Sequence, residues 1–353
     1  MAEDSIMIVT NSVSGGGAER AMNLLANELA NKSYSILLVA LNKSGSDFVE
    51  IKCPVLDFGR EENQGLTGLL KTFYKFVQCV RANKPTVIVT NCDLPELFTS
   101  FLPTRVNILV VEHCNPSWST RKSLGQIVRR ILRARSATFV AVSSHLTIWP
   151  FNSNPEGFLP NMLVPLEEIE LVQAGYKVKR LIFVGRMAKL QKQPHILLEI
   201  SKKLDLPVIF IGDGEERERL KVRSDSELID AAFFEFQIDP WKMFRQGDLL
   251  VVPSAFEGDG LVVLEAIQRN IPLLVADIPD FRRFQLPDHN YCGTTLDYCD
   301  RITKFSDKLD ALVISHSTKM KLVAERTADK VLRSFVHIVQ GTQKSVQAKT
   351  NFN

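Results

Sequence analysis

Short apolar runs of strand length alternate with helix-length segments along this chain, in two separate series. The first series has a helical segment over 18–30 and strand-like runs at 6–10, 35–41, 86–90, 106–111 and 137–142. The second series has strand-like runs at 180–184, 206–211, 231–236, 248–252 and 271–275. Such alternation is typical of a parallel sheet covered by helices on both faces. We therefore predict an α/β protein with two doubly wound, Rossmann-like domains.

The length of the chain and a lapse in this pattern divide it into domains. At 353 residues, the chain exceeds what one hydrophobic core usually organises. After Pro160 the alternation gives way to a stretch with prolines and glutamates. We predict an N-terminal domain over 1–160, a linker over 161–178 and a C-terminal domain over 179–318. Apolar residues at helical spacing over 319–346 predict one long helix that returns toward the N-terminal domain, in a segment 319–353 with a frayed end.

Charge, cysteine content and the length of apolar runs narrow the class of protein. Lys and Arg total 43 against 40 Asp and Glu, so the net charge of +3 does not favour a nucleic-acid partner. The 6 cysteines form no C-x-x-C pair, and most stand beside apolar residues, which is typical of reduced core thiols. The start of the chain is acidic, and no apolar run approaches the ~20 residues of a membrane-spanning helix. We expect a cytoplasmic protein.

A glycine-rich loop separates the first strand-like run from the first helical segment. Gly15, Gly16 and Gly17 lack the Cβ atoms that would hold an anion away, and the helix start offers unpaired N–H groups. The junction therefore predicts a phosphate contact; the alternative is a glycine turn without a ligand. The spacing is not G-x-G-x-x-G, and the second strand ends at Lys43 without an acid, which disfavours a nicotinamide oxidoreductase.

Two cations follow the first strand-like run of the second series. Arg186 ends the sequence Phe183-Val184-Gly185-Arg186, and Lys192 comes shortly afterwards at a predicted helix start. A guanidinium and an ammonium at one strand–helix corner can together neutralise a diphosphate and stabilise it as a leaving group. The alternative is that both are solvated surface charges, as most lysines and arginines are.

The segment with the strongest signal follows the strand-like run 248–252. Glu257 is expected in a loop at the carboxyl end of that strand, and Glu265 one to two turns inside the next helix. Eight helical residues would span ~12 Å, beyond the ~5 to 9.5 Å of hydrolase carboxylate pairs. Two separate tasks, one on a sugar and one on a ribose, fit better. The alternative is that both acids only stabilise a helix N-terminus.

Together, these segments resemble glycosyltransferase family 4, a retaining GT-B family that builds bacterial surface polysaccharides and glycolipids. The resemblance covers nearly the whole chain. It is carried by the Gly-Gly-Ala-Glu loop, Pro160-Asn161, Val184-Gly185-Arg186 with its downstream lysine, Ile211-Gly212-Asp213-Gly214, and the Glu-x7-Glu element. It implies two domains facing a cleft, with the acceptor on the N-terminal domain and the nucleotide sugar on the C-terminal one.

The resemblance also implies roles for individual residues. Glu257 would meet the transferred sugar, Glu265 the nucleotide ribose, and Arg186 with Lys192 the diphosphate. The remaining residues of the predicted nucleotide-sugar site are Phe236, Gln237 and Ile238, whose backbone would face the base, and Gly258, Asp259, Gly260 and Leu261. Asp259 stands where the family usually has an aromatic or small residue, which alters the donor-sugar pocket. Asn270 replaces a usual glycine and tolerates the same backbone.

A histidine completes the predicted catalytic set. His113 ends the strand-like run Val110-Val111-Glu112, and the resemblance implies that it contacts the donor; the alternative is a structural histidine at a strand end. Glu112 is a weaker candidate. The chain contains no D-x-D sequence and no cluster with zinc-like spacing. We therefore expect no metal and no other cofactor, with the C-terminal-domain cations supplying the positive charge.

A basic amphipathic segment covers residues 120–135. Its apolar residues Leu124, Ile127, Val128, Ile131 and Leu132 share one face, and its cations, Arg121, Lys122, Arg129, Arg130, Arg133 and Arg135, lie largely elsewhere. Such a helix can lie on an anionic bilayer or hold a lipid-diphosphate acceptor. The alternative is a helix packed on the sheet with a solvated charged face.

The expected activity is transfer of a sugar from a nucleotide sugar to an acceptor hydroxyl. The resemblance favours a UDP-sugar donor, retention by front-face departure, and a lipid-linked oligosaccharide acceptor in O-antigen or capsular polysaccharide assembly. Two alternatives stay open on the same scaffold: a sugar-nucleotide epimerase, which would form product without an acceptor, and a non-catalytic nucleotide-sugar binding module, which would bind tightly without turnover.

Overall fold

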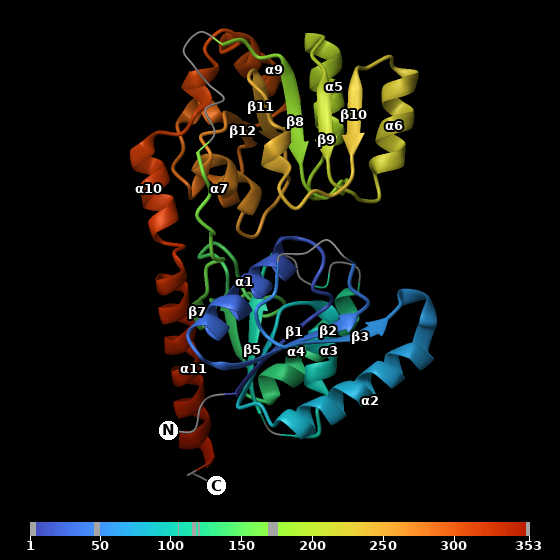
Figure 1. Cartoon of the computed structure of the whole chain (residues 1–353), viewed down its shortest axis with the longest axis vertical. Helices are drawn as coiled ribbons and strands as arrows, with labels where there is room; N and C mark the ends of the chain where they lie inside the picture. The colour runs from blue at the N-terminus through green and yellow to red at the C-terminus, as the bar shows by residue number, and fades with distance from the viewer. Residues whose placement is uncertain are drawn as a thin grey trace. The chain divides into compact units, whose positions relative to one another are not determined.

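Two compact units make up the chain. The computed structural model describes residues 5–45, 50–104, 106–114, 118, 121–168 and 176–350. Unit 1 contains Met1–Met162 and Arg326–Asn353, and unit 2 contains Leu163–Glu325 (Figure 1). Unit 1 is therefore built from two stretches of chain that are separated in sequence by the whole of unit 2.

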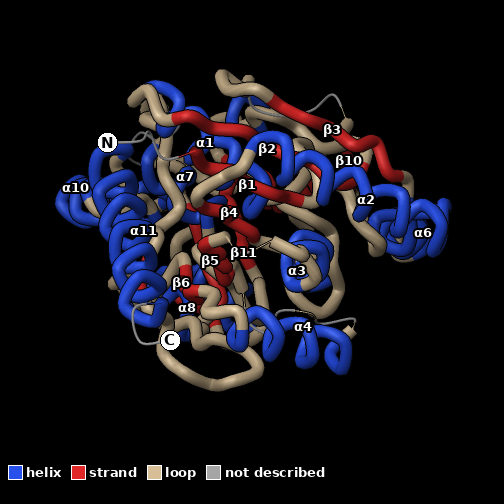
Figure 2. The backbone as a smooth tube through the Cα atoms, turned by 90° about the horizontal axis from the view of Figure 1, so that it is seen from below, coloured by secondary structure: helices blue, strands red, loops and turns tan. Residues whose placement is uncertain are grey.

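A parallel sheet forms the centre of unit 1. Within the described residues its strand order is β3-β2-β1-β4-β5-β6-β7, and Figure 2 shows β2, β1, β4, β5 and β6 following one another across the unit. The strands are β1 Ser5–Thr10, β2 Ser35–Asn42, β3 Val55–Arg60, β4 Val87–Thr90, β5 Asn107–Glu112, β6 Thr138–Ala141 and β7 Gly157–Phe158. Apolar side chains on both faces bury the central strands β1, β4, β5 and β6, as is typical of a parallel sheet, whereas the edge strand β3 is largely exposed.

Helices cover both faces of this sheet. Alternate residues of β1 point to opposite faces, so Ile6 and Ile8 pack with α1 and α11, whereas Met7 and Val9 pack with α2 and α3. The helix α4 covers β5 and β6 on the second of these faces through Val128. The helices of unit 1 are α1 Gly17–Asn31, α2 Gly65–Asn83, α3 Asp93–Ser100, α4 Lys122–Ala134 and α11 Ala328–Thr350, with the short 3-10 helix η1 Glu62–Gln64.

Unit 2 repeats this architecture. Its parallel sheet has the order β10-β9-β8-β11-β12-β13 among the described residues. The strands are β8 Arg180–Val184, β9 Val208–Ile211, β10 Ala231–Phe234, β11 Asp248–Val252, β12 Leu273–Ala276 and β13 Tyr291–Cys292. The helices are α5 His195–Leu204, α6 Arg217–Ser226, α7 Leu261–Gln268, α8 Pro279–Arg282, α9 Thr295–Lys304 and α10 His316–Ala324, with the 3-10 helices η2 Pro240–Met243, η3 Asp288–Asn290 and η4 Leu309–Leu312. One sheet face packs against α7, and the other against α5, α6 and α9.

The C-terminal segment differs from its prediction. The single helix predicted over 319–346 is wrong, because the structure has two helices, α10 and α11, separated by residues 325–327. The break falls where the chain leaves unit 2 and enters unit 1. Leu322 packs into the core of unit 2, whereas Val331 and Phe335 belong to the core of unit 1. Helical spacing continues across the break, so periodicity alone does not reveal it.

Candidate functional site

The carboxyl edge of the unit 2 sheet gathers most of the predicted site residues. Because the strands are parallel, the loops after β8, β9, β10, β11 and β12 all leave from this edge. Gly212 brings the first two loops together: its φ is +135°, and a Cβ atom there would lie 2.2 Å from the Gly185 carbonyl oxygen. Only glycine permits this approach. The Met187 N–H donates to the Asp213 carbonyl at 2.8 Å, which ties the two loops further.

Glu257 and Lys192 meet at this edge. The loop after β11 carries Glu257, which is 7% exposed, and the Lys192 Nζ lies 2.5 Å from its Oε1. The Ser254 hydroxyl donates to the same oxygen at 2.7 Å. The two loops are also joined through the backbone, since the Ala255 N–H donates to the Gln191 carbonyl at 2.8 Å. The structure thus unites two residues that the sequence placed in separate motifs.

Arg186 lies on the same loop as Lys192 but is more accessible. Its side chain is exposed, and its guanidinium donates to the Gln191 side chain at 3.1 Å. Glu257 offsets the Lys192 charge, whereas the hydrogen bond of Arg186 goes to a neutral amide. The loop after β8 therefore offers one exposed guanidinium next to one ammonium that is already ion-paired.

Glu265 lies on α7, which follows the loop that carries Glu257. Gly260 is the N-cap residue of α7 with a φ of +63°, and a Cβ atom there would lie 2.9 Å from a ring carbon of Phe281. Glu265 is buried within the helix and accepts a hydrogen bond from the Trp241 indole at 3.1 Å. The two glutamates thus have different partners, one a loop lysine and the other a tryptophan of η2.

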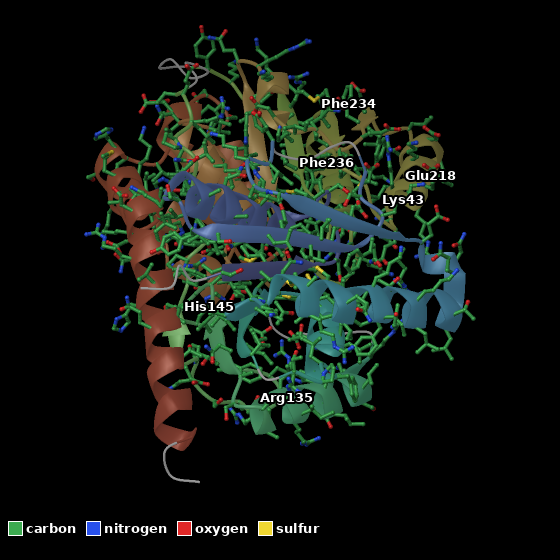
Figure 3. All side chains as sticks on the ribbon, turned by 60° about the horizontal axis from the view of Figure 1, so that its bottom comes forward. Lys43, Arg135, His145, Glu218, Phe234 and Phe236 are labelled. Atoms are coloured by element: carbon green, nitrogen blue, oxygen red, sulfur yellow. The ribbon has the colours of Figure 1, made fainter. Side chains whose placement is uncertain are left out.

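Phe236, Gln237 and Ile238 follow β10 at the same edge. The strand predicted over 231–236 is shorter in the structure, because β10 ends at Phe234 and leaves Phe236 in the loop (Figure 3). The Phe236 N–H donates to the Asp213 carboxylate at 2.9 Å, and this side-chain partner replaces the next strand hydrogen bond. Phe236 and Ile238 are both exposed.

Asp280 and Arg283 contact the Glu257 loop, and the sequence analysis missed both. The Asp280 carboxylate accepts from the Glu257 N–H at 2.8 Å. The Arg283 guanidinium donates to the Asp259 carboxylate at 2.7 Å and to the Asp259 carbonyl at 2.8 Å. The sequence does contain a signal for them, because an acid and a base closely follow β12, a strand that ends at this same edge.

The predicted residues of unit 1 lie at the carboxyl edge of its own sheet. Gly15, Gly16 and Gly17 are exposed between β1 and α1, and Gly16 is the N-cap residue of α1. His113 follows β5 directly and is half-buried. The exposed glycines leave the start of α1 accessible to an anion.

Glu112, the weaker candidate next to His113, belongs to a buried ion-pair cluster. The side chain of Arg129, on α4, is 1% exposed and pairs with both Glu112 and Glu96. It also donates to the Trp149 carbonyl at 2.7 Å, and the Trp118 indole donates to Glu96 at 2.9 Å. The Glu112 carboxylate is therefore engaged in an ion pair inside unit 1.

Arg129 does not lie on the solvated, polar side of the amphipathic segment, where the sequence pattern placed it. Arg129 points into the core because Glu96 and Glu112 are there to meet it. The outward face of α4 carries the exposed residues Lys122, Leu124, Ile127, Arg130 and Arg133. Ile127 is 54% exposed, so the core does not consume the whole apolar stripe. Residues 119 and 120 lie outside the described residues.

Burial and neighbouring acids shift the pKa values in this cluster. Desolvation is the largest cause that raises the pKa of Glu112, to about 7, and the negative charges of Glu96 and Asp93 add to it, while Arg129 acts in the opposite direction. Desolvation followed by Glu96 raises the pKa of Asp93. One guanidinium thus faces three carboxyl groups.

A groove on unit 1 lies away from these residues. It has a volume of about 670 Å³ and is lined by Lys32 and Tyr34, which lie between α1 and β2, and by residues of α11. Its polar lining residues include Lys32, Tyr34, Arg333 and His337. Tyr34 precedes β2 and so lies at the amino edge of the sheet. None of the predicted site residues lines this groove.

Comparison with known proteins identifies the class. Residues 170–327 match the family model described as Glycosyl transferases group 1. The chain is 21% identical over 336 residues to the Campylobacter jejuni GalNAc-alpha-(1->4)-GalNAc-alpha-(1->3)-diNAcBac-PP-undecaprenol alpha-1,4-N-acetyl-D-galactosaminyltransferase, covering 90% of this chain and 91% of that protein.

Two other relatives match over shorter stretches. The Escherichia coli O-antigen biosynthesis glycosyltransferase WclY is 35% identical over 107 residues, which are 28% of this chain and 30% of that protein. The Arabidopsis thaliana sulfoquinovosyl transferase SQD2 is 27% identical over 183 residues, 46% of this chain and 35% of that protein. The chain thus spans about a third of the length of these two relatives.

Solved structures show the fold. The lipopolysaccharide outer core galactosyltransferase WaaB superposes with a TM-score of 0.66 at 16% identity, covering 96% of this chain and 99% of that one. HepE of Anabaena, solved with UDP and glucose, superposes with a TM-score of 0.71 at 16% identity, covering 98% and 100%. These neighbours confirm the predicted fold class, two Rossmann-like domains of the GT-B type with a C-terminal helix. Residues 170–327, which match the group 1 glycosyl transferase model, make up most of the second of these domains.

The described residues show neither a metal site nor a membrane-spanning helix. Among the described residues, no group of three or more His, Cys, Asp and Glu side chains is placed to hold a metal ion. No helix in the described part of the chain is long and apolar enough to cross a membrane.

Proposed function

We propose that this chain is a glycosyltransferase that moves a sugar from a UDP-sugar to a hydroxyl of a lipid-linked oligosaccharide in O-antigen or capsular polysaccharide assembly. One observation carries the proposal. The Lys192–Glu257 pair lies at the carboxyl edge of the unit 2 sheet, beside the exposed Arg186, within the segment that matches group 1 glycosyl transferases. Undecaprenol-linked saccharide and O-antigen synthesis in the names of two relatives support the acceptor class.

The residues of unit 2 suggest how the donor is bound. Arg186 and Lys192 would hold the diphosphate, and the approach of phosphate oxygens to Lys192 would compete with its pairing to Glu257. Glu257 is then released to accept hydrogen bonds from hydroxyls of the transferred sugar. Glu265 would accept from a ribose hydroxyl while Trp241 fixes its orientation. The exposed backbone around Phe236 would meet the base.

The chemistry proposed is retaining and independent of metal. When the bond between the anomeric carbon and the phosphate oxygen breaks, the negative charge on the departing UDP would be stabilised by Arg186 and Lys192. The acceptor oxygen forms the new bond on the same face of the sugar, and its proton passes to the departing phosphate. In unit 1, His113 and the glycine loop before α1 would contact the donor and its phosphates.

A thermal-shift panel of UDP- and GDP-sugars in the presence of EDTA tests the donor. A ligand that binds only the folded state raises the apparent stability. We expect stabilisation by UDP-sugars that EDTA does not abolish. Stabilisation by GDP-sugars alone would contradict the UDP assignment, and stabilisation that requires an added divalent ion would contradict metal independence.

Product stereochemistry tests retention. The anomeric configuration of the first-formed product is read by NMR, with a donor taken from the panel. Retention gives the configuration of the donor, whereas inversion would overturn the front-face step.

The outward face of α4 supports a peripheral position on the cytoplasmic face of the membrane. Exposed Leu124 and Ile127 lie among Lys122, Arg130 and Arg133, and α4 contains no acidic residue. Such a face suits an anionic bilayer surface, where a lipid-linked acceptor would be found. Sedimentation with anionic vesicles that decreases for the double variant Ile127→Ser/Arg130→Ser would support this placement, and unchanged sedimentation would contradict it.

A further inference from the structure

The loop that carries Glu257 is held by a segment with no role in the function proposed above. The short helix α8 and the residue after it follow β12, and they contact residues 257–260 of the neighbouring loop. Both segments leave from the same edge of the sheet, because β11 and β12 are adjacent parallel strands. This contact joins residues that are more than twenty positions apart in sequence.

Asp280 acts on the backbone of Glu257 itself. Its Oδ2 accepts from the Glu257 N–H at 2.8 Å, a charge-assisted bond to the peptide unit next to the Glu257 Cα. That bond fixes the orientation of the peptide and with it the direction in which the side chain leaves the backbone. The Ser254 and Lys192 contacts to the Glu257 carboxylate depend on this direction.

Arg283 connects the loop to α8 through three hydrogen bonds. Its Nη2 donates to the Asp259 carbonyl at 2.8 Å and to the Asp259 Oδ1 at 2.7 Å, while its Nε donates to the Asp280 carbonyl at 2.8 Å. The Asp259 side chain is 1% exposed, so Arg283 also neutralises a buried charge that stands two residues from Glu257.

We propose that Asp280 and Arg283 are positioning residues that hold the Glu257 carboxylate in its orientation toward the transferred sugar. The proposal rests on the glycosyltransferase function proposed above. It also explains the aspartate at position 259, whose carboxylate gives Arg283 a second bond to the loop. The two residues act through the loop backbone and need no contact with substrate.

This role predicts that loss of Asp280 or Arg283 affects the binding of a UDP-sugar more than the binding of UDP. UDP lacks the transferred sugar, so its affinity depends on the Arg186 and Lys192 corner. A displaced Glu257 competes less with phosphate for Lys192, so UDP affinity should change little and should not fall. The affinity gained by adding the sugar, and the turnover of the bound donor, depend on that orientation.

Arg283→Ala and Asp280→Ala are compared with Arg282→Ala as a matched control. Arg282 is adjacent in sequence, but its guanidinium pairs with Asp277 and Asp288 instead of the loop that carries Glu257. We expect the first two variants to lower kcat at least tenfold. They should also lose most of the affinity that the sugar adds to UDP, measured with UDP-glucose or with whichever UDP-sugar is bound. The UDP affinity of these two variants should stay within about threefold of wild type. The Arg282→Ala protein should stay within about threefold of wild type in kcat and in both affinities. Asp280→Asn, whose carbonyl still accepts from the Glu257 N–H, should restore much of the loss.

A double-mutant cycle separates positioning from a general loss of structure. If Arg283 acts through Glu257, then Arg283→Ala adds less than about threefold to the kcat loss of Glu257→Gln, because the interaction it supports is already gone. Full additivity of the two losses, or a kcat loss in Arg283→Ala no larger than in Arg282→Ala, would overturn the proposal.

Hydrogen exchange in the ligand-free protein distinguishes this proposal from the function on which it rests. The Glu257 amide should exchange at least tenfold faster in Asp280→Ala than in Arg282→Ala, since only the former loses its acceptor. Equal exchange would show that α8 does not hold the loop, whatever the activity. Faster exchange in a protein that transfers no sugar from any donor would instead overturn the assigned reaction and leave the hold on the loop standing.

Discussion

At the scale of single residues, Lys192 pairs with Glu257, and the proposed function gives these two charges different ligands, phosphate and sugar. A lysine that binds phosphate and a glutamate that binds a sugar would each be less selective alone, because each would accept many partners. Their mutual neutralisation favours a ligand that brings both an anion for the lysine and hydroxyls for the glutamate. A nucleotide sugar has both parts.

Replacing Glu257 and Arg186 separately should give different kinetic results. We expect Glu257→Ala to reduce transfer at least about 100-fold, because the sugar loses its partner, while UDP binding is kept or strengthened, because Lys192 is freed from its ion pair. Arg186→Ala should weaken UDP binding roughly tenfold and reduce transfer as well, because the diphosphate is present in both states. Calorimetry with UDP and a transfer assay measure the two effects. Lys189→Ala, which removes an exposed cation of the same loop, is the control; wild-type rates in either test variant would show that the site lies elsewhere.

The buried cluster around Arg129 should make stability depend on pH through Glu112. The pKa of Glu112 is raised from 4.5 to about 7 by burial and by Glu96 and Asp93, so the folded state holds this proton more tightly than the unfolded state. The contribution of Glu112 to the stability is therefore fully present below about pH 4.5 and is lost as the pH rises through 7.

Glu112→Gln removes this dependence. The glutamine is neutral at every pH. The free energy of unfolding of the variant minus that of wild type should therefore be larger at pH 8 than at pH 5. Urea denaturation at the two pH values measures the difference. A relative stability that is the same at both, or that moves the other way, would show that Glu112 is ionised throughout this range because of Arg129.

At the scale of elements, the turns after β8 and β9 show how the unit 2 sheet builds its edge. Gly212→Ala should reduce the free energy of unfolding of unit 2 by roughly 2 to 4 kcal/mol, from backbone strain and steric overlap together. The overlap is severe, because the new Cβ would lie 2.2 Å from the Gly185 carbonyl oxygen. Gly185→Ala is a matched control: its φ is +142°, but its Cβ would meet nothing within 4 Å, so only strain remains. Equal losses in chemical denaturation would mean that the close approach contributes nothing.

How far the sequence predicts these elements depends on whether a signal is local. The alternation of apolar strands and helices is local, and the fold class follows from it. Loops at strand ends are also local, which is why Arg186, Lys192 and Glu257 could be selected. Arg129 was misplaced because its partners, Glu96 and Glu112, lie on other elements. Asp280 and Arg283 were missed for the same reason, since their importance lies in contacts to a loop more than twenty residues away.

At the scale of the whole molecule, α11 completes the core of a unit that was begun more than 150 residues earlier. Phe335 is buried in that core, so Phe335→Ala should cost unit 1 roughly 3 to 5 kcal/mol. Hydrogen exchange should become faster in the strands of unit 1 and stay unchanged in those of unit 2. Arg333→Ala, at an exposed position of the same helix, should leave both unchanged. Faster exchange confined to unit 2 would contradict the assignment of α11 to the unit 1 core.

The return of α11 to unit 1 has a consequence for how the chain is made. Ribosomes synthesise the strands of unit 1 first and α11 only after all of unit 2 has been synthesised. Until then, α1 alone packs on this face of the first sheet, and the apolar surface that receives Val331, Leu332 and Phe335 is open to water and to other chains. Unit 2 has no such delay, because its sequence is continuous. The half made second can therefore finish folding before the half made first, and the newborn chain is most in need of a chaperone on its oldest part.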